Sequence, residues 1–133
     1  MSDFSERRIA LVGGAGFIGH HLALKLKSLG AEVLVVDSLA VNNLYSLHRE
    51  GRKNANAELY LRVIRERLDL LEESAVPLEV MDARDYGGLS QVLAGFDPDA
   101  IVHLAAVAHA GKSNKDPFST FDHSLRTLEN ALD

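Results

Sequence analysis

Three glycines follow the first apolar run of the chain at a spacing that suits the binding of a phosphate group. Gly13, Gly16 and Gly19 come directly after the apolar residues 9–12, at the start of a predicted helix. The first glycine would make a sharp turn, the second would let the backbone touch a pyrophosphate, and the third would let the helix pack closely. Free N–H groups and the positive end of the helix dipole would then face the anion, without a lysine.

A carboxylate stands at the end of the next apolar run. Residues 33–36 form a β-branched stretch that ends at Asp37. A carboxylate in this place accepts hydrogen bonds from the adenosine ribose hydroxyls and repels a 2′-phosphate. No Arg or Lys directly follows Asp37, so the sequence favours NAD over NADP. The alternative, an Asp that only caps a turn, stays open.

The elements that must position these residues alternate between strands and helices. Apolar runs predict strands, and apolar residues every three or four positions predict helices. The predicted strands are 9–12, 33–36, 77–81 and 100–104; the predicted helices are 18–29 ending at Gly30, 60–71, 86–94 capped by Gly95, and a last helix from the N-cap Asp116 and Pro117 to the chain end, with one turn of helix near 44–47 in a loop over 38–56. The first of these helices carries the stripe Ile18, Leu22, Leu26 and Leu29, which we expect to be buried. Such alternation predicts an α/β fold, an incomplete doubly wound parallel sheet of about four strands in one domain, 1–133.

Composition excludes several classes of function. A formal net charge of -5 argues against general nucleic-acid binding, and the absence of cysteine excludes disulfides, thiolate zinc sites and a cysteine nucleophile. The polar start and the lack of a long apolar run predict neither a signal peptide nor a membrane span, so we expect a cytoplasmic protein. The six histidines lack metal-ligand spacing, and we expect no metal.

Three motifs follow one another along the chain: the loop Val12 to Gly19, the segment Asp82-Ala83-Arg84-Asp85, and Val102 to Ala106 followed by Ser113 and Pro117. Together they resemble the NAD-dependent epimerase/dehydratase family, the extended short-chain dehydrogenase/reductases with a Rossmann fold that act largely on nucleotide sugars. The resemblance implies that residues of these motifs, together with the two at the end of the second apolar run, hold the dinucleotide: Gly13, Gly16, Phe17, Ile18, Gly19, Asp37, Ser38, Asp82, Ala83, Leu104, Ala105 and Ala106. Within this set Asp82 would accept from the adenine amino group, although a strand-end Asp can instead be the N-cap of the following helix.

The sequence also departs from that family. Ser124 and Thr127 stand where the family has Asn and Gly, and the segment 54–74 is longer than usual, with no function that the sequence indicates. The family's catalytic Tyr-x-x-x-Lys is absent, because Tyr45, Tyr60 and Tyr86 are followed four places later by Arg, Ile and Ser. We therefore expect no catalytic residue in this chain.

Three hypotheses remain. The first is the NAD-binding portion of an epimerase/dehydratase-type oxidoreductase, inactive alone, whose nucleotide-sugar substrate would bind a longer form. The second is a non-catalytic NAD(P)-binding sensor or partner module. The third is a structural remnant whose open sheet edge next to the first strand pairs with another copy. For all of them we expect a homo-oligomer, since truncation of a doubly wound sheet exposes apolar edge and face.

Overall fold

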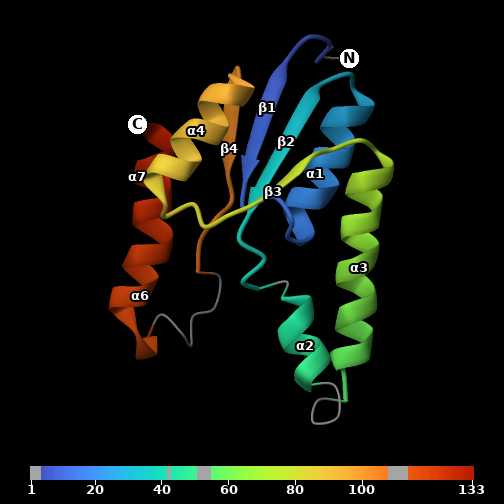
Figure 1. Cartoon of the computed structure of the whole chain (residues 1–133), viewed down its shortest axis with the longest axis vertical. Coiled ribbons are helices and arrows are strands. Elements are labelled where there is room, and N and C mark those ends of the chain that lie inside the picture. The colour runs from blue at the N-terminus through green and yellow to red at the C-terminus, as the bar shows by residue number, and fades with distance from the viewer. Residues whose placement is uncertain (1–3, 42, 51–54, 108–113) are drawn as a thin grey trace.

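The computed structural model describes residues 4–41, 43–50, 55–107 and 114–133, and it shows a parallel sheet between two layers of helices (Figure 1). The four strands are β1 (Arg8–Val12), β2 (Glu32–Asp37), β3 (Leu78–Val80) and β4 (Ala100–His103). Their order is β3-β2-β1-β4, and every neighbouring pair is parallel. This order matches the first four strands of the doubly wound dinucleotide-binding sheet, whose strand order is 3-2-1-4-5-6, and it confirms the predicted fold class.

The central strands β1 and β2 are buried on both faces. Leu11, Val33 and Val35 pack with the helices of one layer, while Val12 and Val36 belong to the core under the other layer. Both faces need apolar side chains because helices cover both, which is why these strands are continuous apolar runs without alternation. The edge strand β4 differs, because Ala100 and Ile101 at its start are exposed.

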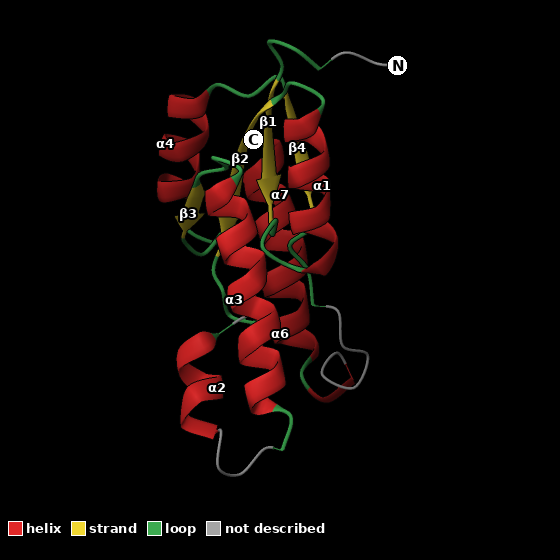
Figure 2. Cartoon of the chain, turned by 90° about the vertical axis from the view of Figure 1, so that its right-hand side faces the viewer, coloured by secondary structure: helices red, strands yellow, loops and turns green. Residues whose placement is uncertain are grey.

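Helices cover both faces of the sheet, and some of them extend beyond it. α1 (Phe17–Ser28) and α3 (Ala57–Glu73) lie on one face, and α4 (Tyr86–Phe96) and α7 (Thr127–Leu132) lie on the other (Figure 1). The short α2 (Leu44–Glu50) packs beside the start of α3, beyond the end of the sheet (Figure 2). No helix in the described ranges combines the length and the apolar character needed to cross a membrane.

Three details of the helices differ from the sequence predictions. Ile18 is 68% exposed, and the buried residues of α1 include Ala23 and Leu26 together with His20. Gly95 lies inside α4 and does not cap it; the left-handed residue that ends this helix is Asp97, with φ 52°. Its N–H reaches Leu93 O at 2.7 Å, so a single bond closes the last turn. The cap at Gly30 is confirmed by its φ of 93°.

The last helix is not continuous. α6 (Pro117–Phe121) begins at the predicted N-cap, where Asp116 accepts from the Ser119 N–H, and it passes through a π-helical segment, η1 (Asp122–Arg126), into α7. The hydroxyl of Thr127 donates to His123 O at 2.7 Å, an interaction with the preceding turn that often accompanies irregular helix geometry. This segment therefore carries a local widening beside the ends of the strands.

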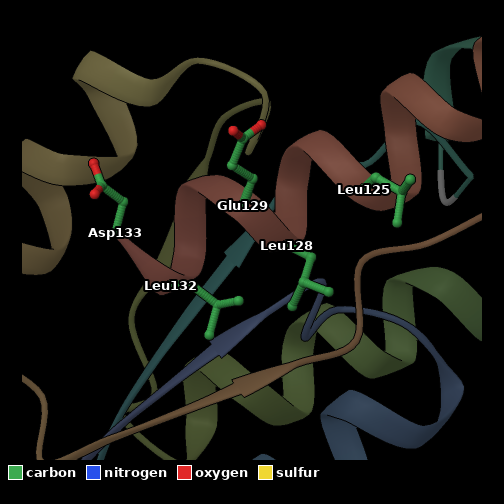
Figure 3. A pocket seen from close by; sticks show the side chains of 5 residues that line it. All are labelled: Leu125, Leu128, Glu129, Leu132 and Asp133. Atoms are coloured by element: carbon green, nitrogen blue, oxygen red, sulfur yellow. The ribbon is translucent and has the colours of Figure 1, made fainter.

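The apolar stripe of the last helix does not face the core. All its members belong to the exposed large apolar side chains of the described residues: Phe118, Phe121, Leu125, Leu128 and Leu132. Leu125, Leu128 and Leu132 point to one side of the helix, away from Glu129 and Asp133, and these five residues line a shallow groove (Figure 3). The helix instead packs inward through Thr127, which is buried, and through Asn130, which donates to Ala83 O at 2.9 Å.

Candidate functional site

A cavity of about 830 Å3 opens where β1, β2 and β4 end. This is the place where doubly wound sheets bind ligands, outside the carboxyl ends of the strands at the switch in strand order. Its walls include most of the residues that the sequence singled out: Gly13, Gly16, Phe17, Asp37, Ser38, Asp82, Ala83, Leu104, Ala105 and Ala106. Ile18 and Gly19 are not among them, since Ile18 points to solvent and Gly19 is buried in the helix contact below the loop.

The three predicted glycines meet different requirements. Gly13 has φ +81°, and a Cβ there would lie 2.5 Å from the backbone N of Ala105. A Cβ on Gly19 would collide with the backbone carbonyl of Gly14. Around Gly16, by contrast, an added Cβ would meet nothing within 4 Å. The loop is therefore closed on the protein side and open at its middle, toward the cavity.

A fourth glycine in the loop was missed. A Cβ on Gly14 would lie 2.8 Å from the side chain of Leu11 and 3.0 Å from that of Val35. The backbone oxygen of Leu11 would lie 2.9 Å from the same Cβ, so β1 and β2 together leave no room for a side chain at Gly14, which lies between the glycines of the motif. The spacing of the motif carries no signal for such a contact.

Asp37 ties the glycine-rich loop to the end of β2. Its Oδ2 accepts from the Ala15 N–H at 3.0 Å, and its Oδ1 accepts from the Leu39 N–H at 2.8 Å. The turn-capping alternative therefore describes one real role of this side chain. Each carboxylate oxygen has a second lone pair, and Asp37 lines the cavity, so the capping role leaves acceptor capacity toward the cavity.

Asp82 is held by Arg84 and does not cap the following helix. The N-cap of α4 is Asp85, whose side chain accepts from the Gly88 N–H. Asp82 Oδ2 lies 2.6 Å from Arg84 Nη2, and Oδ1 accepts from the Arg84 N–H at 2.9 Å. These hydrogen bonds hold the pKa of Asp82 below its usual range, so the carboxyl stays ionised.

The same arginine links this loop to the last helix. Arg84 Nη1 lies 2.8 Å from Asp122 Oδ2, and Arg126 Nε lies 2.7 Å from Asp122 Oδ1. The pKa of Asp122 is lowered by these hydrogen bonds, with Arg126 contributing most, and the pKa of Arg84 is raised by its two carboxylate partners. The ion-pair chain fixes the position of η1 relative to the Asp82 loop.

Two histidines near the loop are neutral at neutral pH. The ring of His20, 4% exposed, donates from Nδ1 to Gly16 O at 2.9 Å, since a carbonyl can only accept. Burial lowers the pKa of His20, with smaller contributions from the charges of His21 and Arg67. Burial also lowers the pKa of His103, whose Nδ1 is buried without a hydrogen-bond partner among the described residues. His20 therefore steadies the loop without adding charge to it.

Ser124 and Thr127, the two departures from the resembled family in the last helix, bind the end of β4 and the segment after it. Ser124 Oγ accepts from the Val107 N–H at 3.1 Å, and Thr127 Oγ1 lies 3.3 Å from His103 Nε2. Both side chains join the last helix to the segment that follows β4. Ser113, the other polar residue of that motif, lies outside the described residues, as does His109.

Several lining residues are not among those that the sequence assigned to the dinucleotide. They come from β2 and the loop after it, from α3, from the segments that follow β3 and β4, and from the stretch between Lys115 and the start of α7: Val36, Ala40, Val41, Arg67, Met81, Val107, Lys115, Asp116, Ser119, Thr120, His123 and Thr127. Their place at the cavity depends on how distant segments pack. In the described part of the chain, no group of three or more His, Asp or Glu side chains is arranged to hold a metal ion.

Comparison with known proteins assigns the chain to a family. Residues 9–133 match the model of the NAD dependent epimerase/dehydratase family. The chain belongs to this family. Among curated members it is 30% identical over 125 residues to UDP-glucose 4-epimerase 4 of Oryza sativa subsp. japonica, covering 91% of this chain and 29% of that protein. It is 33% identical over 120 residues to the UDP-glucose 4-epimerase of Rhizobium meliloti (strain 1021), covering 90% and 29%.

A solved structure of the epimerase/dehydratase family has the same architecture. The UDP-glucose 4-epimerase of Thermus thermophilus, in complex with NAD, superposes with a TM-score of 0.70 at 30% identity. The match covers 94% of this chain and 32% of that one. The chain thus spans about 30% of the length of these relatives and is a partial epimerase/dehydratase domain.

Proposed function

We propose that this chain is the NAD-binding portion of a nucleotide-sugar epimerase/dehydratase-type oxidoreductase and does not turn over substrate by itself. The observation that carries the proposal is the open space above Gly16, inside a cavity that Asp37 and Asp82 also line. Family membership and an NAD complex of a relative support the choice of cofactor.

The residues present fit a dinucleotide. Backbone amides at Gly16 and Phe17, at the N-terminus of α1, would hold the pyrophosphate, where the helix dipole favours an anion. Asp37 would accept from the adenosine ribose, and Asp82 with Ala83 would contact the adenine. Leu104, Ala105 and Ala106 would form the wall on the nicotinamide side, where small side chains leave room against the backbone.

When bound, NAD supplies a hydride acceptor. The residues of this chain would bind and orient the NAD. The ends of β1, β2 and β4 belong to one sheet, so the sheet fixes the residues that line the cavity relative to one another. Proton exchange in the family uses a Tyr-x-x-x-Lys pair, and no tyrosine of this sequence has a lysine four places later. The proposed role is therefore cofactor binding without turnover.

Calorimetric titration with NAD and NADP tests the proposal. We expect NAD to bind more tightly than NADP, since the carboxylate of Asp37 disfavours a 2′-phosphate. Gly16→Val should abolish NAD binding while the circular dichroism spectrum stays unchanged. Unaltered NAD binding by a folded Gly16→Val protein would refute the assignment of the loop.

A non-catalytic NAD(P) sensor or partner module is the second candidate, favoured by the missing catalytic pair. The native product separates the two candidates by its intact mass and by the reading frame after Asp133. Continued coding with a Tyr-x-x-x-Lys helix supports the enzyme, and a stop codon supports the module.

We also propose that the protein is cytoplasmic and forms a homo-oligomer. The exposed stripe of the last helix supports the second point, with Phe118 80% and Leu132 79% exposed on one chain. A second copy would cover this stripe or the edge at β4. Sedimentation showing only monomer at tens of micromolar, a range set by ordinary interface affinities, would refute self-association. Cell fractionation tests the location.

A further inference from the structure

The long segment between β2 and β3 brings a cationic side chain to the glycine-rich loop. Arg67 is half-buried in α3, which lies on the same face of the sheet as α1 (Figure 1). Its guanidinium carbon lies 5.7 Å from the centroid of the Phe17 ring, at the first residue of α1. Arg67 lines the same cavity as Gly13 and Gly16. Arg67 is therefore close to the glycine-rich loop in space although it is distant from the loop in sequence.

The charged side chains that line the cavity show why the position of Arg67 matters for an anionic ligand. The described lining residues with permanent charge are the carboxylates Asp37, Asp82 and Asp116 and the cations Arg67 and Lys115. Lys115 comes from the segment before α6, a helix that lies on the opposite side of the molecule from α3 (Figure 1). On the side of the glycine-rich loop, the groups that could attract an anion are the neutral backbone amides and Arg67. The carboxylate of Asp37 lies nearby, at the end of β2. A positive side chain there would add to the backbone amides and the helix dipole in stabilising a dianionic ligand.

The neighbours of Arg67 hold its charge near the loop. The face of the Phe17 ring attracts a guanidinium, which favours a position above the start of α1. The positive field of Arg67 reaches His20, whose ring donates to Gly16 O, and it contributes to the lowered pKa of that histidine. His20 stays neutral, so Arg67 is the permanent cation on this side of the loop among the described lining residues.

We propose that Arg67 binds the pyrophosphate of the dinucleotide at the glycine-rich loop. This inference rests on the proposed function and gives the segment 54–74 a role in the site. The guanidinium, held over Phe17, supplies fixed positive charge and N–H donors that complement the backbone amides. Arg suits this task because its planar fork pairs with phosphate oxygens and stacks on an aromatic ring at once.

The test compares Arg67 with another arginine of the same helix. Arg67→Ala and Arg67→Gln are titrated by calorimetry with NAD, NADP, ADP-ribose and adenosine, beside the control Arg65→Ala, an exposed position of α3. We expect Arg67→Ala and Arg67→Gln to weaken NAD and ADP-ribose about tenfold, which corresponds to ~1.4 kcal/mol. Adenosine, which has no phosphate, should bind all variants equally. If Arg67→Ala fails to fold, Arg67→Gln still tests the inference, because glutamine keeps much of the length of the side chain and removes its charge.

Salt dependence gives a second readout. Binding of NAD to the unaltered protein should weaken between about 50 and 200 mM salt more steeply than binding to Arg67→Gln, because the variant has lost one screened ion pair. Equal affinity of Arg67→Gln and Arg65→Ala for NAD would overturn the inference and leave the proposed function intact. A loss confined to NADP would place Arg67 at the 2′-phosphate and overturn the pyrophosphate assignment. Failure of the unaltered protein to bind NAD would overturn both.

Discussion

Alanine substitutions at Gly13 and Gly16 should have opposite effects on stability, and the substitution at Gly16 should weaken NAD binding in a stable fold. Gly13 has φ +81°, and its added Cβ would lie within 2.8 Å of three backbone atoms of Leu104 and Ala105. A left-handed non-glycine residue costs about 1–2 kcal/mol, and overpacking costs about 1–3 kcal/mol more. We therefore expect Gly13→Ala to lose roughly 2–5 kcal/mol, a large share of the about 5–15 kcal/mol that stabilises a domain.

Gly16→Ala should leave the fold intact. Gly16 has φ -74° and ψ -175°, a conformation that alanine adopts without strain, and its Cβ would stand in open space. Reduced freedom of the unfolded chain should raise stability by up to about 1 kcal/mol. The new methyl group would occupy the space above the loop, so NAD affinity should fall by at least about tenfold, or ~1.4 kcal/mol.

Urea unfolding and calorimetric titration together measure both effects. Gly95→Ala is the matched control, because Gly95 lies within α4 and its Cβ would also meet nothing within 4 Å. It should gain about 1 kcal/mol from helix propensity and bind NAD normally. The reasoning fails if Gly16→Ala binds NAD as well as Gly95→Ala does, or if Gly13→Ala is as stable as the unaltered protein.

Three further outcomes follow from the site. Asp37→Ala removes the acceptor of two backbone N–H groups, so the free energy of unfolding should fall by about 1–3 kcal/mol in urea. NAD binding should weaken, and the preference for NAD over NADP should shrink. Unchanged stability would contradict the capping role. Arg84→Ala leaves Asp122 with one cation and should cost about 1 kcal/mol in urea, a loss that shrinks in high salt. Burial lowers the pKa of His20 and His103 below 6.5, so on acidification the unfolded chain takes up protons before the folded protein does. The free energy of unfolding should therefore fall as the pH drops from about 7 to about 5. The double variant His20→Gln, His103→Gln should make this dependence on pH weaker.

Local sequence was sufficient for the parts of the fold that depend on near neighbours. The turn at Gly13, the cap at Gly30 and the N-cap Asp116 follow from backbone conformations and short-range hydrogen bonds. The apolar runs of β1 and β2 required burial on both faces, which predicted a parallel sheet covered by helices. These elements also placed Gly16 and Asp37 at one edge, since parallel strands all end on the same side.

Tertiary packing decided what periodicity and motif spacing left open. An apolar stripe predicts a helix with one apolar face, but only the packing shows that Phe118 and Leu132 meet solvent while Thr127 turns inward. Gly95 has the right residue type for a cap, yet α4 continues to Phe96 and ends at Asp97. Arg67 reaches the glycine-rich loop because α3 packs beside α1, a long-range contact that no spacing along the chain encodes. Local sequence determined the turn of the glycine-rich loop, and the packing of distant helices decided which charged side chains surround that loop.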